Sequence, residues 1–378
     1  MTARSKVRDR CIHLQTMNTT LDLTELNIQV GRLFMAGIPG PTLDKGTESL
    51  IREFCLGGVI LFNRNIKDPV QLALLCKDLQ DKALYYHGIP LFIAVDQEGG
   101  VVTRLKKPFT QFPGNKAIAN DKEPLARARE FALVTAREMR LVGLNMDLAP
   151  VLDVCGNECE THLKGRTFGD DPRKVAELGS TVIKILQENA ILATAKHFPG
   201  LGKATLDPHN HLPTIRANTN DIYNVDLMPF RAAMSENVST IMSSHAVYTD
   251  LEPDLPATIS YNILTRLIRE EMGFNGLIMT DDLEMGSIRD NWGVAEGAVA
   301  AFEAGADILL ICHNQNNILE AINLLRDRII SEKIEFKRVL QSLERIEKAK
   351  SSFIRPDYRV SIKDVRRYFV EGLTTDMK

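Results

Sequence analysis

The chain has 378 residues with a formal net charge of -3, and 44% of them are hydrophobic while 25% are charged. This composition is typical of a globular protein with a sizeable core, and the interspersed acids and bases form no basic stripe of the kind that nucleic-acid binding requires. No apolar run is long enough to cross a bilayer, and the charged N-terminus lacks the apolar segment of a signal peptide. We therefore expect a cytoplasmic protein with neither nucleic-acid nor membrane partners.

Apolar, β-branched runs bounded by Gly, Asn or Asp recur along the chain after a polar lead-in over residues 1–28. Each run predicts a strand. The eight predicted strands cover residues 30–37, 57–62, 91–96, 144–151, 193–198, 240–245, 276–281 and 307–313. Helical periodicity occupies much of the sequence between them, at 68–88, 123–143, 172–189 and 260–273, and further helix is expected over 315–353.

The alternation of strands and helices predicts an α/β fold. Strands that are apolar throughout belong in a parallel sheet covered on both faces, and eight is the number that closes a TIM-type (β/α)8 barrel. A doubly wound open sheet is the competing arrangement. Because no low-complexity linker interrupts the chain, we predict a single catalytic domain over residues 29–355, followed by a C-terminal extension over residues 356–378.

The six cysteines are scattered through the chain rather than arranged as a disulfide framework. We therefore expect reduced thiols. Cys155 and Cys159 form a single CxxxC with no second pair, which is only a weak indication of a zinc site.

Polar side chains follow the predicted strands at their C-terminal ends. In a parallel barrel all of these ends open on one face, where active sites are built. A single acid at a strand end is more often a helix cap, so the prediction of an active site rests on the whole set. The set comprises Asp96 with the rest of DQEGG (96–100), Asp153, Lys196, His197, His245, Asp281, Asp282 and His313.

Three histidines lie in the stretch TAKHFPGLGKATLDPHNHLP, which covers residues 194–213. His209 and His211 make an HxH pair, which could ligate the metal of an amidohydrolase-like barrel together with His197, His245 and Asp281. Amidohydrolase barrels carry that pair at the end of the first strand, however, whereas here it follows the fifth. The order of the motifs therefore disfavours a metal site.

Proton transfer is the alternative role for these histidines. Asp207 precedes His209 by two residues across Pro208, so a turn could aim the carboxylate at one ring nitrogen and leave the other for substrate. Such a dyad is an acid/base, because a histidine near its free pKa of ~6.5 both gives and takes a proton around neutral pH. An isolated Asp-x-His is also a common loop hydrogen bond, so this alternative stays open at this point.

Nine segments of the chain resemble glycoside hydrolase family 3, and in particular its single-barrel bacterial β-N-acetylhexosaminidases. The segments occur in family order over about residues 30–315. They are GGVILFNRNI (57–66), AVDQEGGVVTRL (94–105), NMDLAPVLDV (145–154), GRTFGDDP (165–172), KHFPGLGKATLDPHNHLP (196–213), DLMPF (226–230), IMSSHAVY (241–248), GFNGLIMTDDLEM (273–285) and AGADILLI (304–311).

The resemblance implies a retaining mechanism without metal or cofactor. Asp281, the first acid of TDDLEM, would attack the anomeric carbon, and Asp282 would point to the other side of the strand. His209, oriented by Asp207, would protonate the leaving oxygen and then deprotonate water. The implied reaction is removal of terminal β-linked N-acetylglucosamine from glycans such as peptidoglycan fragments.

Sugar binding is implied by the resemblance for Asp96, Arg104, Arg166, Lys196 and His197. Carboxylates and cationic donors of this kind suit the hydroxyl groups of a pyranose. The alternatives to an N-acetylhexosaminidase are a β-glucosidase or β-glycoside phosphorylase of the same family, a metal-dependent barrel hydrolase, and a catalytically inactive sugar-binding relative.

Two positions depart from the family pattern. Val101 stands where the family often has Arg, and Pro208 where it has Ser or Gly. Because Arg104 is retained, the first change leaves the proposed sugar contacts in place. The second is expected to stiffen the loop that carries the Asp207–His209 dyad.

Overall fold

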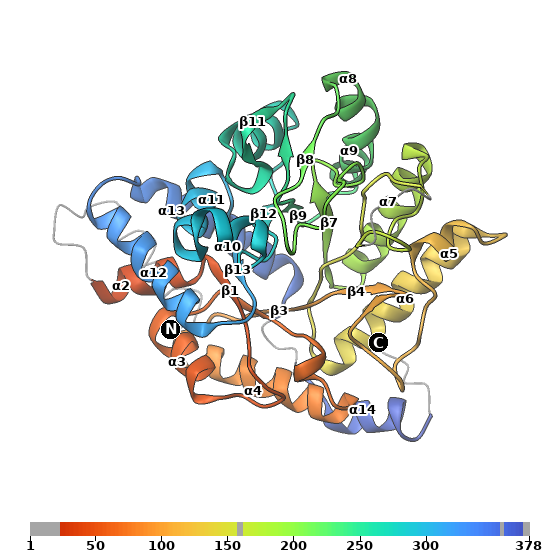
Figure 1. Ribbon diagram of the computed structural model, residues 1–378. Helices are drawn as coiled ribbons and strands as arrows, with labels where there is room; N and C mark the ends of the chain where they lie inside the picture. Colours follow the sequence, from red (N-terminus) through yellow and green to blue (C-terminus); the bar gives the residue numbers. More distant parts are fainter. Residues whose placement is uncertain (1–22, 157–161, 356–358, 373–378) are drawn as a thin grey trace.

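Eight short parallel strands form the centre of the molecule in this computed structural model, which describes residues 23–156, 162–355 and 359–372. The strands pair in the order β12-β9-β7-β6-β3-β2-β1-β13 (Figure 1). A parallel bridge between Met279 and Ile308 joins β12 to β13, so the sheet closes into a barrel and the open-sheet alternative is wrong. These strands are β1 (Phe34–Gly37), β2 (Gly58–Ile60), β3 (Phe92–Val95), β6 (Met146–Asp147), β7 (Leu192–Phe198), β9 (Thr240–Ser243), β12 (Leu277–Thr280) and β13 (Leu309–Ile311).

Helices surround the barrel, as predicted for a (β/α)8 fold (Figure 1). The α-helices of the described residues are α2 (Leu23–Gly31), α3 (Lys45–Phe54), α4 (Pro69–His87), α5 (Asn115–Ala119), α6 (Pro124–Val142), α7 (Pro172–Glu188), α8 (Thr219–Asp221), α9 (Met228–Ser235), α10 (Gly286–Trp292), α11 (Val294–Ala304), α12 (Gln315–Ile330), α13 (Phe336–Phe353) and α14 (Ile362–Phe369). Short 3-10 turns occupy η2 (Asn63–Asn65) and η4 (Ala257–Ile259), and helices of π type occupy η3 (Ile222–Asp226) and η5 (Asn262–Glu271).

Local sequence signals explain where the long helices begin and end. The Asp68 carboxylate accepts hydrogen bonds from the Val70 and Gln71 amides at the start of α4, and Gly88 ends the helix with a φ of 69°. An aspartate at the N-cap satisfies amides that have no partner within the helix, and only glycine enters the left-handed region without steric cost. Both ends of α4 are therefore set by the residues that predicted them.

Two predicted boundaries differ from the structure. Val30 and Gly31 end α2 instead of opening the first strand, and the predicted domain start at residue 29 falls inside this helix. The helix expected over 315–353 is divided into α12 and α13 by a turn over residues 331–335. At the first break the residues on both sides are buried alike, so an apolar pattern does not show the change of backbone conformation.

Two small sheets stand on the C-terminal face of the barrel. A hairpin of β4 (Gln97–Gly99) and β5 (Val102–Thr103) follows β3 directly. A second sheet joins β8 (Thr214–Ile215), β10 (Val247–Tyr248) and β11 (Glu252–Pro256). Since β8 follows the histidine-rich stretch, this sheet holds one end of that loop over the face.

The C-terminal extension includes α14, which packs on α4 and α6 at the side of the barrel. The rings of Phe109 and Phe369 lie 4.6 Å apart, centroid to centroid, and add an aromatic contact to this packing. None of the helices in the described part of the chain is long and apolar enough to span a membrane.

The cysteines differ in state along the chain. Cys55, Cys76 and Cys312 are free and buried, as expected. Cys155 is disulfide-bonded, so the prediction of reduced thiols is wrong there. Cys159, the other member of the CxxxC pair, lies outside the described residues.

Candidate active site

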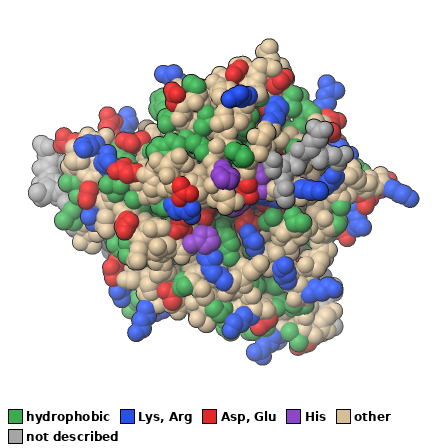
Figure 2. All heavy atoms as spheres, viewed as in Figure 1, with side chains coloured by type: hydrophobic (Ala, Val, Ile, Leu, Met, Phe, Trp, Pro, Cys, Tyr) green, Lys and Arg blue, Asp and Glu red, His purple; other side chains and the backbone are tan. Residues whose placement is uncertain are grey.

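The polar residues that follow the strands meet on the C-terminal face of the barrel, as predicted. Asp96 follows β3, Lys196 and His197 end β7, and Asp281 follows β12. Figure 2 shows histidine side chains gathered near the middle of one face of the molecule, with basic and acidic side chains around them.

Four of the five predicted sugar-binding side chains belong to one connected set of ion pairs. The Lys196 ammonium lies 2.8 Å from Asp96 Oδ1 and 2.7 Å from Glu98 Oε1. Arg166 donates two hydrogen bonds of 2.8 Å to the Glu98 carboxylate, and Arg104 lies 3.1 Å from Asp96 Oδ2. These ion pairs thus connect the end of β7 to the loops that follow β3, β5 and β6.

Burial makes these ion pairs strong. The Lys196 side chain is 2% exposed and the Glu98 side chain is fully buried. Burial opposes ionisation of Glu98, but Arg166 and Lys196 outweigh it and lower its pKa from 4.5 to about 2. Burial likewise opposes the charge on Lys196, and Asp96 and Glu98 still raise the pKa of its ammonium. The network is therefore charged at neutral pH, with donors fixed for a polar ligand.

His197, the fifth predicted sugar-binding residue, is oriented by a buried carboxylate. Its Nδ1 lies 2.7 Å from Asp153 Oδ2, and the other oxygen of Asp153 accepts hydrogen bonds from the His197 and Leu201 amides. Burial raises the pKa of Asp153, but His197 and these amides bring it below its usual value. An ionised Asp153 requires the proton of His197 on Nδ1, which leaves Nε2 free to face the site.

The two adjacent acids after β12 have different surroundings. Asp282 braces the neighbouring loop, because its Oδ1 accepts hydrogen bonds from the Glu284 and Cys312 amides. Asp281 accepts a hydrogen bond of 2.8 Å from the Asp282 amide through Oδ1. No side-chain donor to Asp281 is found in the described part of the chain. Asp281 is thus the acid of this pair that is not committed to holding the loop.

Asp281 is held ionised by its surroundings. Burial alone would raise the pKa of its carboxyl group, but His197, His245, the Asp282 amide and Lys196 together lower it below 3.8. Burial lowers the pKa of His245, whose Nε2 lies 3.0 Å from the Asp282 carbonyl oxygen. This buried histidine also holds the backbone beside Asp281 in place.

The Asp207–His209 contact predicted from the sequence is present. His209 Nδ1 lies 2.6 Å from Asp207 Oδ1, and the His209 amide donates to the same oxygen at 3.0 Å. Burial raises the pKa of Asp207, but these two hydrogen bonds lower it below its usual value. The side chain of His209 is 62% exposed, so its Nε2 remains accessible. The dyad makes no hydrogen bond or ion pair to the buried network within the described ranges.

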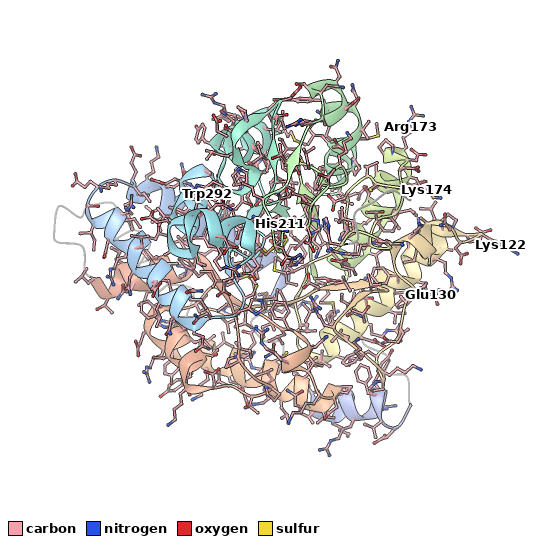
Figure 3. All side chains as sticks on the ribbon, in the orientation of Figure 1. Lys122, Glu130, Arg173, Lys174, His211 and Trp292 are labelled. Carbon is pink, nitrogen blue, oxygen red and sulfur yellow. The ribbon has the colours of Figure 1, made fainter. Side chains whose placement is uncertain are left out.

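The dyad loop contacts the helix that follows Asp281. The Gly286 amide donates to the His209 carbonyl oxygen at 2.9 Å, and the Ser287 amide donates to the Pro208 carbonyl oxygen at 3.2 Å. His211, on the same loop, lies near the middle of the molecule in the view of Figure 3 and is exposed. Within the described residues, no three His, Cys, Asp or Glu side chains are grouped to hold a metal ion.

A family model for the glycosyl hydrolase family 3 N terminal domain matches residues 23–349 of the chain. The chain belongs to glycoside hydrolase family 3. It is 35% identical over 285 residues to a beta-hexosaminidase of Thiobacillus denitrificans, and the alignment covers 74% of this chain and 78% of that protein. A beta-hexosaminidase of Nitrosomonas eutropha is 35% identical over 299 residues, which cover 77% of this chain and 84% of that protein.

Solved structures of two similar enzymes have the same fold. A family 3 beta-N-acetylglucosaminidase from Paenibacillus sp. str. FPU-7 is 37% identical with a TM-score of 0.86, and the match covers 90% of this chain but only 64% of that one. A beta-N-acetylhexosaminidase from Beutenbergia cavernae is 28% identical with a TM-score of 0.79, covering 88% of this chain and 100% of that one. The predicted family and the TIM-type barrel are confirmed, and the protein is a glycoside hydrolase.

Three further residues help to build this glycoside hydrolase site, and the sequence assigned no catalytic or sugar-binding role to any of them. Glu98 joins Lys196 to Arg166, and Asp153 orients His197. His162 lies in the loop before Arg166 and accepts a hydrogen bond from it through its carbonyl oxygen. Asp153 had a sequence signal, since it lies just beyond a predicted strand. Glu98 had the same signal, since it lies in the DQEGG segment that follows a predicted strand, whereas His162 lies in a loop without a pattern.

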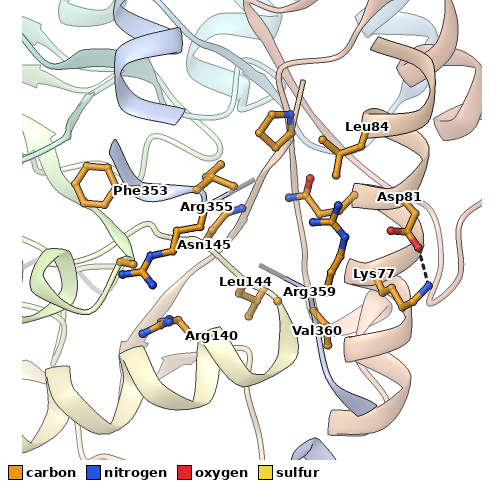
Figure 4. Close-up of a pocket in the computed structure, with 15 residues that line it drawn as sticks. Lys77, Asp81, Leu84, Arg140, Leu144, Asn145, Phe353, Arg355, Arg359 and Val360 are labelled. Atoms are coloured by element: carbon orange, nitrogen blue, oxygen red, sulfur yellow. Dashed lines mark hydrogen bonds and ion pairs between the residues drawn. The ribbon is translucent and has the colours of Figure 1, made fainter. Parts of the chain in front are cut away.

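A separate hollow lies at the opposite end of the barrel. Leu144 and Asn145, which precede β6, line it together with Lys77, Arg140 and Arg355 (Figure 4). In barrels of this class the loops at the N-terminal ends of the strands contribute to stability, whereas catalysis takes place at the C-terminal ends. The hollow is therefore not a candidate for the glycosidase site.

Proposed function

We propose that this family 3 glycoside hydrolase removes terminal β-linked N-acetylglucosamine by a two-step retaining mechanism. The observation that carries the proposal is the contrast between the two adjacent acids. Asp282 is committed to the Glu284 and Cys312 amides, whereas Asp281 is ionised beside His197 and Lys196. A carboxylate held in that state is suited to attack the anomeric carbon.

In the first step an Asp281 oxygen would form a bond to the anomeric carbon while the bond to the leaving oxygen breaks. Doubly protonated His209 would donate its Nε2 proton to that oxygen. The ionised Asp207 carboxylate keeps the other ring proton on Nδ1 and stabilises the imidazolium before transfer. In this proposal the acid belongs to a loop and the nucleophile follows a barrel strand.

In the second step His209 would take a proton from water through Nε2 as the water oxygen attacks the anomeric carbon. The bond to Asp281 breaks, which releases the sugar with its original anomeric configuration and restores the starting charges. Asp96, Arg104, Arg166 and Lys196 would hold the sugar hydroxyls during both steps, because their charged groups are already fixed by one another.

The choice of N-acetylglucosamine rests on the names of the relatives, and the expectation of peptidoglycan fragments as substrates belongs to the same proposal. The cytoplasmic location stays an expectation, and the disulfide at Cys155 is more typical of an oxidising compartment.

The test compares chromogenic β-N-acetylglucosaminide and β-glucoside substrates, each with and without phosphate and with and without a chelator. We expect faster release from the N-acetylglucosaminide, free sugar as the product in phosphate, and full activity after chelation. Preference for the glucoside would favour a β-glucosidase, and a sugar 1-phosphate product would favour a phosphorylase. Loss of activity with chelator and its return with zinc would favour the metal-dependent alternative and contradict the proposal.

A further inference from the structure

The loop that carries the Asp207–His209 dyad is bound to the first turn of α10. The Gly286 and Ser287 amides donate to the carbonyl oxygens of His209 and Pro208, at 2.9 and 3.2 Å. The first amides of a helix have no acceptor within the helix, so they are available for such contacts. Two consecutive backbone hydrogen bonds fix both the position and the direction of the loop at the residue that would transfer the proton.

Gly286 leaves the space in which this contact forms. A Cβ atom at this position would lie 2.9 Å from the His209 carbonyl oxygen and 3.2 Å from the Asn210 carbonyl oxygen. Asp290 Oδ2, at 3.0 Å, belongs to a side chain that can rotate away, but the two carbonyl oxygens are backbone atoms that no side-chain rotation relieves. The φ of Gly286 is not in the left-handed region, unlike that of Gly293 at the other end of the helix. Close approach of the loop, and not a special backbone conformation, therefore explains this glycine.

The same turn is held to the segment that carries Asp281. The Met285 amide donates to the Asp282 carbonyl oxygen at 3.0 Å, and Asp282 Oδ1 accepts the Glu284 and Cys312 amides at 3.1 and 3.2 Å. Residues 281–287 thus form one braced unit with the carboxylate at one end and the loop contact at the other. Because these bonds hold the Asp281 segment and not the His209 loop, we expect a clash at Gly286 to be relieved by displacement of the loop.

We propose that Gly286 is a positioning residue for acid/base catalysis, because its missing side chain sets how closely the His209 loop approaches the segment bearing Asp281. The inference rests on the proposed function. Proton transfer needs the donor within hydrogen-bond reach of the leaving oxygen, about 2.6–3.2 Å between heavy atoms. Displacement of the loop would therefore weaken the acid while leaving the nucleophile in place.

The first variant is Gly286→Ala, measured with N-acetylglucosaminides whose leaving groups are good or poor. We expect kcat for the poor leaving group to fall about 10-fold or more, since misplacement by about 1 Å costs on the order of 100-fold. For a good leaving group, which needs little protonation, the first step should slow less than about 3-fold. An equal loss for both leaving groups would overturn the proposal, and so would unchanged or faster turnover.

Gly297→Ala is the matched control. A Cβ atom at Gly297, in α11, would lie 2.6 Å from Ile288 Cγ2, so the variant crowds α10 from the core side without touching the loop. It should lower thermal stability while leaving the ratio of the two rates unchanged. If Gly297→Ala changed that ratio as much as Gly286→Ala, a general disturbance of α10 would explain both and the inference would be wrong.

Ser287→Pro is a second variant that adds no Cβ atom at Gly286. It removes the amide that donates to the Pro208 carbonyl oxygen, and proline is tolerated in the first turn of a helix. As with Gly286→Ala, we expect Ser287→Pro to slow cleavage of the poor leaving group more than that of the good one. A Ser287→Ala variant, which keeps the amide, should have the same ratio of the two rates as the unaltered protein. If the ratio of the two rates changed equally in Ser287→Pro and Ser287→Ala, the backbone contact would not have the role given to it.

Amide hydrogen exchange tests the contact independently of activity. In the unaltered protein the Gly286 and Ser287 amides should be protected, and in Gly286→Ala the protection at Ser287 should fall. Unprotected amides in the unaltered protein would overturn the inference whatever the enzyme cleaves. Protected amides in a protein that does not cleave N-acetylglucosaminides would instead contradict the proposed function, so the two failures are distinguishable.

Discussion

The ammonium of Lys196 lies 2.7 Å from the Glu98 carboxylate, and both side chains are almost completely removed from solvent. Neither group could be buried at low cost alone, because an unpaired charge in the protein interior is strongly unfavourable. Each is stable there because Arg166 and Asp96 extend the pair into a network of alternating charge. The same network supplies the polar groups for the sugar, so stability and substrate binding depend on the same contacts.

Replacing Glu98 with Gln should be strongly destabilising. The variant leaves Lys196 and Arg166 with one carboxylate fewer, and loss of one member of a buried ion pair costs about 3–5 kcal/mol. Urea denaturation would measure the free energy of unfolding. As a control, Asp81→Asn removes the exposed ion pair with Lys77 and should change it by less than about 1 kcal/mol. Similar values for the two variants would show that the buried network does not stabilise the fold.

The low pKa of Glu98 also predicts how stability depends on pH. Its pKa falls from 4.5 to about 2 in the folded state, so the folded state binds the proton less tightly than the unfolded state. The resulting stabilisation, about 3 kcal/mol, is fully present above 4.5 and is lost as the pH falls from there through about 2. Denaturation at a series of pH values should show that the free energy of unfolding falls less steeply with decreasing pH in Glu98→Gln than in the unaltered protein. The same pH dependence in both proteins would contradict the low pKa of Glu98.

Removing the imidazole of His209 should affect substrates unequally. In a His209→Ala variant Asp281 could still attack, so a good leaving group should depart nearly as fast as before in the first step, while a poor one should lose about 100-fold or more. Single-turnover kinetics would separate this step from the hydrolysis of the intermediate. As a control, His211→Ala changes an exposed histidine of the same loop and should leave the ratio of the rates unaltered. Equal losses for both leaving groups would show that His209 is not the acid.

Much of the fold could be predicted because its signals are local. All eight barrel strands overlap the predicted apolar runs, and α4 lies between Asp68 and Gly88 as its caps indicate. The start of β1 could not be placed in the same way, because Val30 is buried in a helix as completely as it would be in a strand. Periodicity alone does not separate these cases over a few residues.

The site was predicted in part for the same reason. Asp207 and His209 are two residues apart, so their hydrogen bond could be expected from a turn. The role of Glu98 depends on Arg166, which is 68 residues away in sequence, and on Lys196 at the end of a different strand. The contact of Gly286 with His209 likewise joins a helix and a loop that are far apart in sequence. Such pairings carry no local pattern.

The central claim is that Asp281 is the nucleophile, and a covalent trap tests it most directly. A 2-fluoro or 5-fluoro glycosyl probe should form an adduct that peptide mass spectrometry locates on Asp281, because its carboxylate is ionised and Asp282 is committed to the Glu284 and Cys312 amides. Asp281→Asn should abolish trapping, whereas Asp282→Asn should slow turnover by only about 10- to 100-fold and still be labelled. An adduct on Asp282, or a product of inverted anomeric configuration, would contradict the assignment and the two-step mechanism.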